Sequence, residues 1–332
     1  MKITKMIDLH LHLDGAISLA SARQLAKLQG IAIPGDDAAL AELMRVSPDC
    51  HDLNEFLEKF AFPCSLLQTE VGLETAVYNL CEELREQDVI YAEIRFAPQK
   101  SCDKGLTQEE VVLAALRGMQ KSTLRANLIL CCMRGEMTVE NDALNRETLR
   151  LVQKYLDRGV CAADLAGAEA LYATADYEGL FRYATGLGVP FEIHAGEADG
   201  PGSVRAAVAF GASRIGHGVR STEEPCLVAA LATKGIPLLL CPTSNVQTCI
   251  FDSVADMPVC TFLDAGVAFS INTDDPSIEG TTLREEWQAV IDAFGLTAAE
   301  VRAIMLNAVD MAFCNERLRA DLRAEIARAY PQ

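Results

Sequence analysis

The sequence is short of basic residues. Its 332 residues include 29 Lys and Arg against 47 Asp and Glu, which gives a formal charge of −18 at pH 7. A protein whose main partner is nucleic acid needs clusters of Lys and Arg for the phosphates, so this balance argues against that class. The charge does not argue against an uncharged small-molecule partner.

Long apolar runs are also missing. The longest, such as residues 236–241, are far shorter than the about 20 residues of a membrane-spanning helix. Polar and charged residues interrupt the N-terminal segment, where a signal peptide would need an apolar core. We therefore expect a soluble protein that works in the cytoplasm and has no membrane partner.

The chain has twelve cysteines, but no Cys-x-x-Cys pair occurs among them. In a chain without a secretory signal, scattered cysteines indicate reduced and mostly buried thiols. Histidines number only five. We expect these five, and not the twelve cysteines, to be informative about a site.

Linkers rich in Ser, Gly or Pro, short repeats and low-complexity tracts are absent as well. Short apolar runs alternate instead with longer amphipathic ones, which is the pattern of βα units and a parallel sheet. The eight predicted strands are 6–12, 89–97, 127–133, 160–165, 190–194, 214–217, 236–241 and 267–272. The helices predicted between them are 107–124, 140–158, 176–187, 202–210 and 223–234.

One barrel explains the length better than two domains do. Residues 18–87 are too long for a single crossover and contain helical stretches at 19–28, 53–60 and 70–86, and residues 281–329 are helical again. We predict a single α/β domain over 1–332, a (β/α)8 TIM barrel with a helical cap insertion at 18–87 and a helical C-terminal tail. An open doubly wound sheet is the alternative, and the lack of G-x-G-x-x-G after a strand counts against it.

Four of the five histidines lie at the ends of predicted strands, where the catalytic groups of a barrel are found. The polar residues at such ends are His10 and His12, His194, His217, and the pair Asp274 and Asp275. Because side chains two apart share one face of a strand, His10 and His12 point together into the barrel, with Asp8 one layer deeper. Each position alone is weak, but packing alone does not readily place four histidines in this way.

Three imidazoles and one carboxylate from these positions suit one zinc ion with a further position open for water. Zinc lets water ionise near pH 7, which produces a nucleophile. Two-metal barrels commonly bridge their metals with a modified lysine on the fourth strand, and residues 160–165 contain no lysine. We expect one zinc per chain, and we expect His51, in the insertion, to lie outside the site.

Five motifs occur in order along the chain, and together they resemble the adenosine deaminase family over residues 6 to 313 or so. The motifs are His10–Ala16 (HLHLDGA), Asp164–Gly167 (DLAG), His194–Glu197 (HAGE), Arg214–Gly218 (RIGHG) and Ser270–Pro276 (SINTDDP). The resemblance implies a (β/α)8 barrel that uses zinc to convert adenosine or deoxyadenosine and water to inosine or deoxyinosine and ammonia, a reaction of purine salvage.

The resemblance also implies a role for each site residue. It makes metal ligands of His10, His12, His194 and Asp274. Glu197 would protonate purine N1, and His217 would orient and deprotonate the attacking water. The first role is sensible chemically, because adding hydroxide to C6 breaks the ring conjugation and a proton must reach N1. Only a neutral carboxylic acid can give that proton, so the pKa of Glu197 should be raised; alone, Glu197 could equally be a first-turn acid of a helix.

Substrate contacts follow from the same resemblance. Asp275 would bind purine N7 and help place the nucleophile, the backbone N–H of Gly167 would meet N3, and Asp14 would hold a ribose hydroxyl. An apolar lid over the nucleoside is implied by three residues that share one face of the predicted helix 53–60, which are Leu53, Phe56 and Phe60. Spacing alone favours an ordinary core stripe, and both interpretations can hold.

Three other functions remain open. A sister deaminase could act on adenine, aminodeoxyfutalosine or a methylated nucleotide, but the first two typically carry Glu at the position of Asp14 and the third Asn. Amide or ester hydrolysis is disfavoured by the missing lysine and by Glu197, and a non-catalytic zinc-binding protein by the intact set of residues. The separate zinc deaminases with H-x-E and P-C-x-x-C are excluded, because neither pattern occurs.

Overall fold

The computed structural model describes residues 3–47 and 49–331. Within them, eight parallel strands form two four-stranded sheets, in the orders β1-β2-β3-β4 and β5-β6-β7-β8. The strands are β1 (Met6–His12), β2 (Val89–Phe96), β3 (Ala126–Met133), β4 (Val160–Ala166), β5 (Ile193–Ala195), β6 (Ile215–His217), β7 (Leu238–Leu240) and β8 (Phe269–Ile271).

The two sheets are joined at both seams. Isolated parallel bridges connect Leu11 to Asp274 just beyond β8, and Ala163 in β4 to Phe191 just before β5. At the first seam the backbone N–H of His12 donates to the carbonyl oxygen of Asp274 at 2.8 Å. The strands therefore close into a ring, and the predicted α/β barrel class is confirmed.

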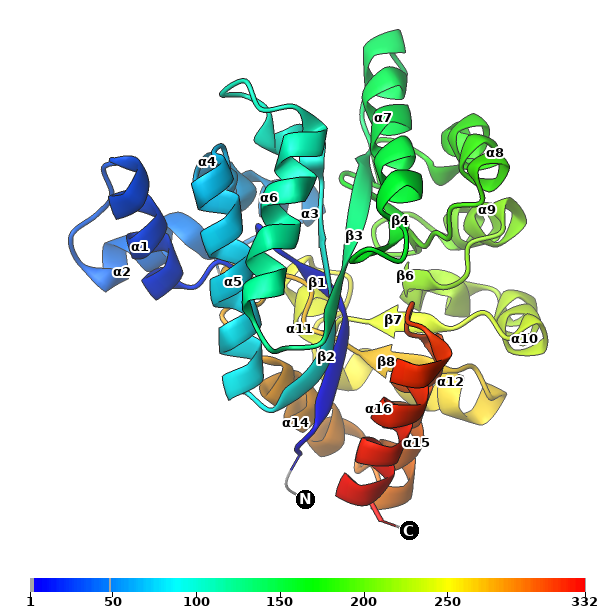
Figure 1. Ribbon diagram of the computed structural model, residues 1–332. Coiled ribbons are helices and arrows are strands. Elements are labelled where there is room, and N and C mark those ends of the chain that lie inside the picture. The colour runs from blue at the N-terminus through cyan, green and yellow to red at the C-terminus, as the bar shows by residue number, and fades with distance from the viewer. Residues whose placement is uncertain (1–2, 48, 332) are drawn as a thin grey trace.

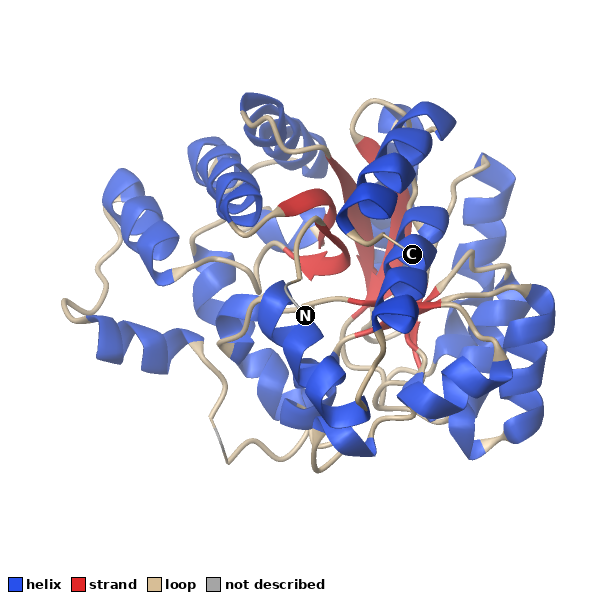
Figure 2. Cartoon of the chain, turned by 90° about the horizontal axis from the view of Figure 1, so that it is seen from below, coloured by secondary structure: helices blue, strands red, loops and turns tan. Residues whose placement is uncertain are grey.

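Helices surround the strands on the outside, as the view in Figure 2 shows. They are α1 (Leu19–Gln29), α2 (Asp37–Met44), α3 (Leu53–Leu57), α4 (Ala61–Ser65), α5 (Glu70–Glu86), α6 (Gln108–Lys121), α7 (Val139–Tyr155), α8 (Glu178–Leu187), α9 (Pro201–Phe210), α10 (Pro225–Lys234), α11 (Pro242–Gln247), α12 (Val259–Ala265), α13 (Pro276–Glu279), α14 (Leu283–Phe294), α15 (Ala298–Met311) and α16 (Glu316–Ala329). Short 3-10 turns fill some of the connections.

All eight predicted strands are present, and β1 has the predicted bounds. The strands of the second sheet are shorter than predicted, because only three residues of each apolar run are regular strand. Their flanking residues, such as Cys241, are nevertheless buried. The apolar pattern therefore predicted burial correctly at these positions, although it overestimated the length of the strands. Helices α2, α4, α11, α12 and α13 were not predicted, since each is too short to show a clear apolar period.

The predicted helix 53–60 is interrupted: α3 ends at Leu57, a 3-10 turn covers Glu58–Phe60, and α4 follows. Pro63 lies inside α4 and cannot donate a hydrogen bond to the carbonyl of Lys59, which breaks the regular α-helical pattern. Glu58 and Phe60, in the 3-10 turn between the two helices, line a cavity together with His12 at the end of β1.

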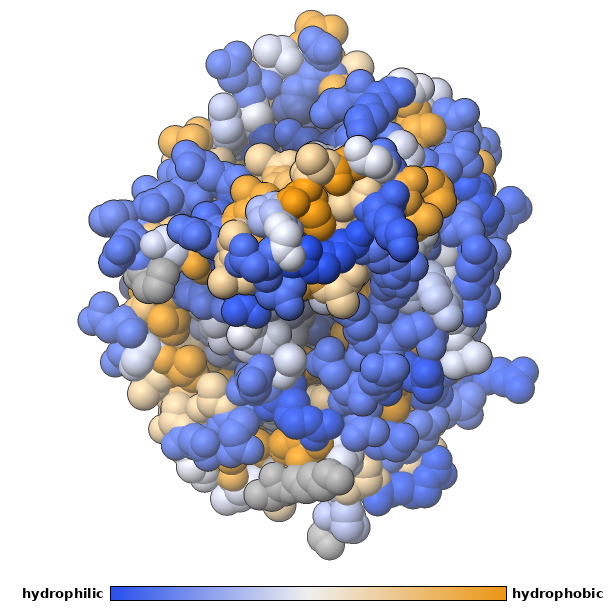
Figure 3. Space-filling view, turned by 90° about the vertical axis from the view of Figure 1, so that its left-hand side faces the viewer, coloured by the Kyte–Doolittle hydropathy of each residue, from blue (hydrophilic) through white to orange (hydrophobic). Residues whose placement is uncertain are grey.

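Two parts of the predicted insertion differ in how they pack. Helix α5 packs against α6 and β2 and so belongs to the wall of helices around the barrel, whereas α1 and α2 lie to the side of it (Figure 1). The face on that side carries a patch of hydrophobic side chains within a mainly hydrophilic surface (Figure 3). The division into one domain with a cap at 18–87 stays a prediction. None of the helices in the described residues is long and apolar enough to cross a membrane.

Candidate active site

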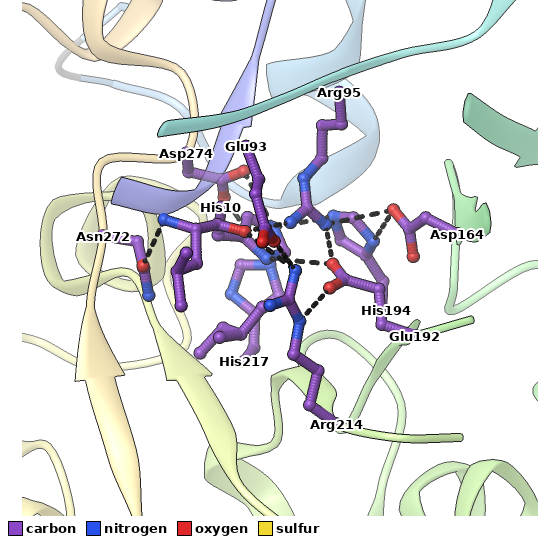
Figure 4. Close-up of polar contacts among 12 residues, drawn as sticks. His10, Glu93, Arg95, Asp164, Glu192, His194, Arg214, His217, Asn272 and Asp274 are labelled. Atoms are coloured by element: carbon purple, nitrogen blue, oxygen red, sulfur yellow. Dashed lines mark hydrogen bonds and ion pairs between the residues drawn. The ribbon is translucent and has the colours of Figure 1, made fainter. Parts of the chain in front are cut away.

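Three imidazoles and one carboxylate converge at the carboxyl end of the barrel; Figure 4 labels His10, His194 and Asp274 of this set. Nε2 of His194, at the end of β5, lies 2.9 Å from Nε2 of His10 and 3.2 Å from Nε2 of His12, which both come from β1. Oδ1 of Asp274, just beyond β8, lies 3.3 Å from Nε2 of His10 and of His12. The fold thus brings together all four residues predicted as metal ligands.

These separations fit a small metal ion that all four residues contact. Ligand atoms about 2.0–2.1 Å from a zinc ion lie about 3.3 Å from one another. The nitrogens cannot all be satisfied by one another, since a neutral imidazole has a single N–H. Nδ1 of His194 lies 2.8 Å from Oδ2 of Asp164, and Nδ1 of His10 lies 3.9 Å from Oε1 of Glu192. A proton held at Nδ1 of His194 by Asp164 leaves the Nε2 lone pair of His194 facing the common centre, whereas the 3.9 Å between Nδ1 of His10 and Glu192 is too long for a hydrogen bond.

His217, at the end of β6, lies beside this set. Its Nε2 is 3.6 Å from Oδ2 of Asp274 and 3.7 Å from Oε2 of Glu197. His10, His194, His217 and Asp274 can also be grouped within 4.8 Å as a possible metal site. Nε2 of His12 lies 3.3 Å from Oδ1 of Asp274, closer than the 3.6 Å between Nε2 of His217 and Oδ2 of Asp274.

The backbone is in the left-handed region at two of these residues. Asp274 has a φ of 75° and His217 a φ of 57°, and the region is uncommon for residues other than glycine. The Asp274 backbone also pairs with β1 at the barrel seam, where its N–H donates to the carbonyl oxygen of His10 at 2.8 Å. This main-chain pairing therefore fixes how the candidate ligands His10 and Asp274 are oriented toward each other.

Paired charges fill the barrel below the histidines (Figure 4). The guanidinium of Arg95 contacts the carboxylates of Asp164 and Glu192, and that of Arg214 contacts the carboxylates of Glu192 and Glu93. All five side chains are buried. Burial would raise the pKa of Asp164, but the charges of His194 and Arg95 outweigh it and hold that pKa below its usual range. No role was predicted for these residues, although acids and arginines within apolar strands are a signal for buried partners.

The electrostatic surroundings of Glu197 and His217 suit proton transfer. Burial, together with the negative charge of Asp274, raises the pKa of Glu197 from 4.5 to about 8. Burial lowers the pKa of His217 to about 3. Near neutral pH Glu197 therefore carries a proton and His217 is a neutral base. The side-chain amide of Asn245, which was not predicted as a site residue, lies 3.3 Å from Nδ1 of His217.

Asp275 lies against the loop after β1. A Cβ atom at Gly15 would be only 1.7 Å from Oδ1 of Asp275, so only glycine permits this approach. Burial and the charge of Asp274 raise the pKa of Asp275 well above its ordinary value, which makes the carboxyl group a hydrogen-bond donor. Gly167, beyond β4, has a φ of 105°, a conformation that glycine adopts readily.

A cavity of about 860 Å³ opens beside the candidate ligands. His12, Asp14, Phe60, Gly167 and others line it, and a smaller cavity of about 40 Å³ lies between the histidines and the predicted lid. The lid residues Leu53 and Phe56 line the smaller cavity, and they pack with Ile278 in a hydrophobic cluster separate from the main core. Leu53 and Phe56 therefore both belong to a hydrophobic cluster and border the candidate site.

Two further acidic or histidine positions lie outside the metal-ligand set. Oδ2 of Asp8, one layer deeper in β1, accepts a hydrogen bond from the hydroxyl of Thr273 at 2.6 Å. His51 is exposed, and its Nδ1 lies 2.9 Å from Oε2 of Glu55. His51 thus lies outside the site, as expected.

Comparison with known proteins agrees with this geometry. Residues 6–329 match the family model described as adenosine deaminase. The chain belongs to the adenosine deaminase family. A relative from Haemophilus ducreyi named adenosine deaminase is 44% identical over 98% of this chain and 97% of its own length. The predicted family, and with it a hydrolase that deaminates purines, is therefore confirmed.

Solved structures share the adenosine deaminase fold. The adenine deaminase from Arthrobacter aurescens superposes with a TM-score of 0.86 at 25% identity, covering 98% of this chain and 99% of that one. An amidohydrolase from Burkholderia ambifaria, solved with bound zinc, gives a TM-score of 0.85 at 22% identity over 98% of this chain and 90% of that one. The fold of this chain is therefore that of known deaminases.

Proposed function

We propose that this member of the adenosine deaminase family hydrolyses the C6 amino group of adenosine and deoxyadenosine, giving inosine or deoxyinosine and ammonia for purine salvage. The observation that carries the proposal is a buried carboxyl group with a pKa of about 8, Glu197, beside three converging imidazoles. The name of the Haemophilus ducreyi relative supports the same activity. We also propose a cytoplasmic location, where the twelve free cysteines would stay reduced.

We propose that one zinc ion per chain is held by His10, His12, His194 and Asp274. Three nitrogens and one carboxylate oxygen form a donor set that zinc prefers, with room for one more ligand. The bound zinc of the Burkholderia ambifaria amidohydrolase supports this choice of metal. When bound, zinc acts as a Lewis acid that makes water nucleophilic near neutral pH.

Glu197 and His217 would move the protons of the reaction. Glu197 gives its proton to purine N1, so that negative charge does not build up on the ring as water adds to C6. His217 accepts a proton from the attacking water, since its lowered pKa keeps the imidazole neutral. Asp275, held protonated by burial, donates a hydrogen bond to purine N7, which is an acceptor.

The remaining residues would place the nucleoside. The backbone N–H of Gly167 meets purine N3, where the missing side chain permits close approach. Asp14 accepts a hydrogen bond from a ribose hydroxyl. Leu53, Phe56 and Phe60 cover the base and exclude bulk water, which strengthens the electrostatic interactions inside the site.

A sister deaminase acting on the free base is the second candidate, because the Arthrobacter aurescens neighbour is named adenine deaminase. Asp14 favours the nucleoside over the free base, because deaminases that act on adenine typically carry Glu at this position. The two candidates can be separated by measuring the turnover of adenosine, deoxyadenosine and adenine by the zinc-loaded protein. Ammonia release is the readout. We expect turnover of both nucleosides and little of adenine. A preference for adenine would contradict the proposal, and a protein inactive on all three would favour a non-catalytic zinc-binding role.

A further inference from the structure

A buried carboxylate outside the metal site binds the backbone of the loop that carries Glu197. Glu169 lies three residues beyond β4 and is 1% exposed. Its Oε1 accepts a hydrogen bond from the N–H of Gly196 at 2.7 Å. Its Oε2 accepts three more from the N–H groups of Glu197, Ala198 and Asp199, at 3.0, 2.8 and 3.0 Å. Four consecutive N–H groups therefore converge on one side chain.

A chain of side-chain hydrogen bonds holds Glu169 in turn. The hydroxyl of Ser203, on α9, donates to Oε1 of Glu169 and lies 2.6 Å from the hydroxyl of Thr174. Nη2 of Arg134 donates to Thr174 at 2.9 Å and to the carbonyl oxygen of His194 at 2.6 Å. Because Arg134 can only donate and Glu169 can only accept when ionised, every bond in the chain runs from Arg134 to Glu169.

We propose that Glu169 is the positioning residue for Glu197, the acid that gives a proton to purine N1. The inference rests on the proposed function, because it assigns Glu169 a part in that proton transfer. Successive backbone N–H groups facing one point form an anion-binding concavity. Here a side chain of the same molecule fills the concavity, so the loop after β5 keeps one conformation before substrate arrives.

Glu169 acts on Glu197 through the main chain. One of the four donors is the N–H of Glu197 itself, and the other three belong to the neighbouring Gly196, Ala198 and Asp199. Glu169 therefore fixes the Cα atom of Glu197, from which the carboxyl group extends toward the purine. A displacement of about 1 Å in a catalytic group can cost about 100-fold in rate. His10, His12 and Asp274 come from other backbone segments, and His194 precedes the four N–H groups that Glu169 binds. Loss of Glu169 should therefore affect the metal ligands less than it affects Glu197.

The test is a double-mutant cycle on the full-length, zinc-loaded protein with adenosine as substrate. In Glu169→Gln, an NH2 group replaces one acceptor oxygen and faces N–H donors. We expect kcat to fall about 100-fold, with KM and zinc content within about threefold of the wild type. In the Glu197→Gln background the same change should lower kcat less than about threefold, because the acid it positions is gone.

Equal losses of kcat in both backgrounds would overturn the proposal, since a general structural role is additive. If Glu169→Gln does not fold, Ser203→Ala removes one donor to Glu169 and should show a smaller loss with the same non-additivity. Thr148→Val, which removes a buried hydrogen bond between Thr148 and Gln108, is the stability control and should lower the melting temperature without changing kcat. A wild type that does not deaminate adenosine would instead contradict the proposed function.

Discussion

Oδ2 of Asp164 lies 2.8 Å from Nδ1 of His194, and both side chains are buried. The contact holds the imidazole in the tautomer that has a proton on Nδ1 and a lone pair on Nε2, the atom facing His10 and His12. Nη1 of Arg95 lies 3.2 Å from the same oxygen of Asp164. Asp164 thus connects the candidate metal site to the buried charges below it.

Replacing Asp164 by Asn should weaken metal binding. The amide can still accept a hydrogen bond from Nδ1, but it removes the negative charge that makes the ring a better ligand. We expect the zinc affinity to fall about 10- to 100-fold, the usual effect of losing such a partner. Titration with a competing chelator measures it. Asp8→Asn is the matched control, because Asp8 is buried in the same barrel but binds Thr273 instead of a ligand ring; an equal loss in both variants would contradict the role given to Asp164.

The roles of Glu197 and Asp274 can be separated by measuring metal and turnover together. Glu197→Gln should keep its zinc and lose nearly all deamination of adenosine, because an amide cannot give a proton to N1. Asp274→Ala should instead lower the zinc content, because it removes one of the four converging ligand atoms. Metal analysis by atomic absorption and an ammonia assay on the same samples test both. Near-normal activity of Glu197→Gln would refute the assigned role.

The sequence predicts the barrel and the approach of the histidines for a definite physical reason. Strands in a barrel are parallel, so their carboxyl ends meet at one edge, and polar residues at those ends must lie close together. His10 and His12 share a face through the two-residue period of a strand. The placement of His194 at the same end of the barrel as both therefore follows from the parallel arrangement of the strands.

The same reasoning misses the residues that act through the main chain. Glu169 accepts hydrogen bonds from backbone N–H groups of residues 196–199, and a backbone donor has no signature in the sequence. Asn245 and Arg134 reach His217 in β6 and the carbonyl oxygen of His194 in β5, contacts between segments far apart in the sequence that depend on the finished fold. Short helices such as α11 and α12 were not predicted for a related reason. A helix of fewer than two turns shows no helical period of apolar residues in the sequence.

Cys64 should contribute to nucleoside binding through Asp14. Its Sγ lies 3.6 Å from Oδ2 of Asp14, and burial raises the pKa of the thiol so far that it stays a donor. Among the described residues no donor reaches Oδ1 of Asp14, which leaves that oxygen for the substrate. Cys64→Ala should raise the KM for adenosine about two- to fivefold with little change in kcat, the size of one weak hydrogen bond. Cys81→Ala, a buried cysteine on α5, is the control; an unchanged KM in Cys64→Ala would contradict the contact.

The stability of the protein should depend on pH through Glu197. The pKa of Glu197 is about 8 in the folded protein and near the ordinary 4.5 when unfolded, because burial penalises the charged form. Between these two values the folded state holds a proton that the unfolded state has lost, so the free energy of unfolding falls as pH rises, by up to about 1.4 kcal/mol per pH unit. Glu197→Gln has no such group. Its melting temperature should therefore equal that of the wild type near pH 4.5 and exceed it increasingly up to pH 8, with both proteins free of metal. A difference in melting temperature that does not change with pH would show that Glu197 is already ionised in the folded protein, and would leave it unable to protonate N1.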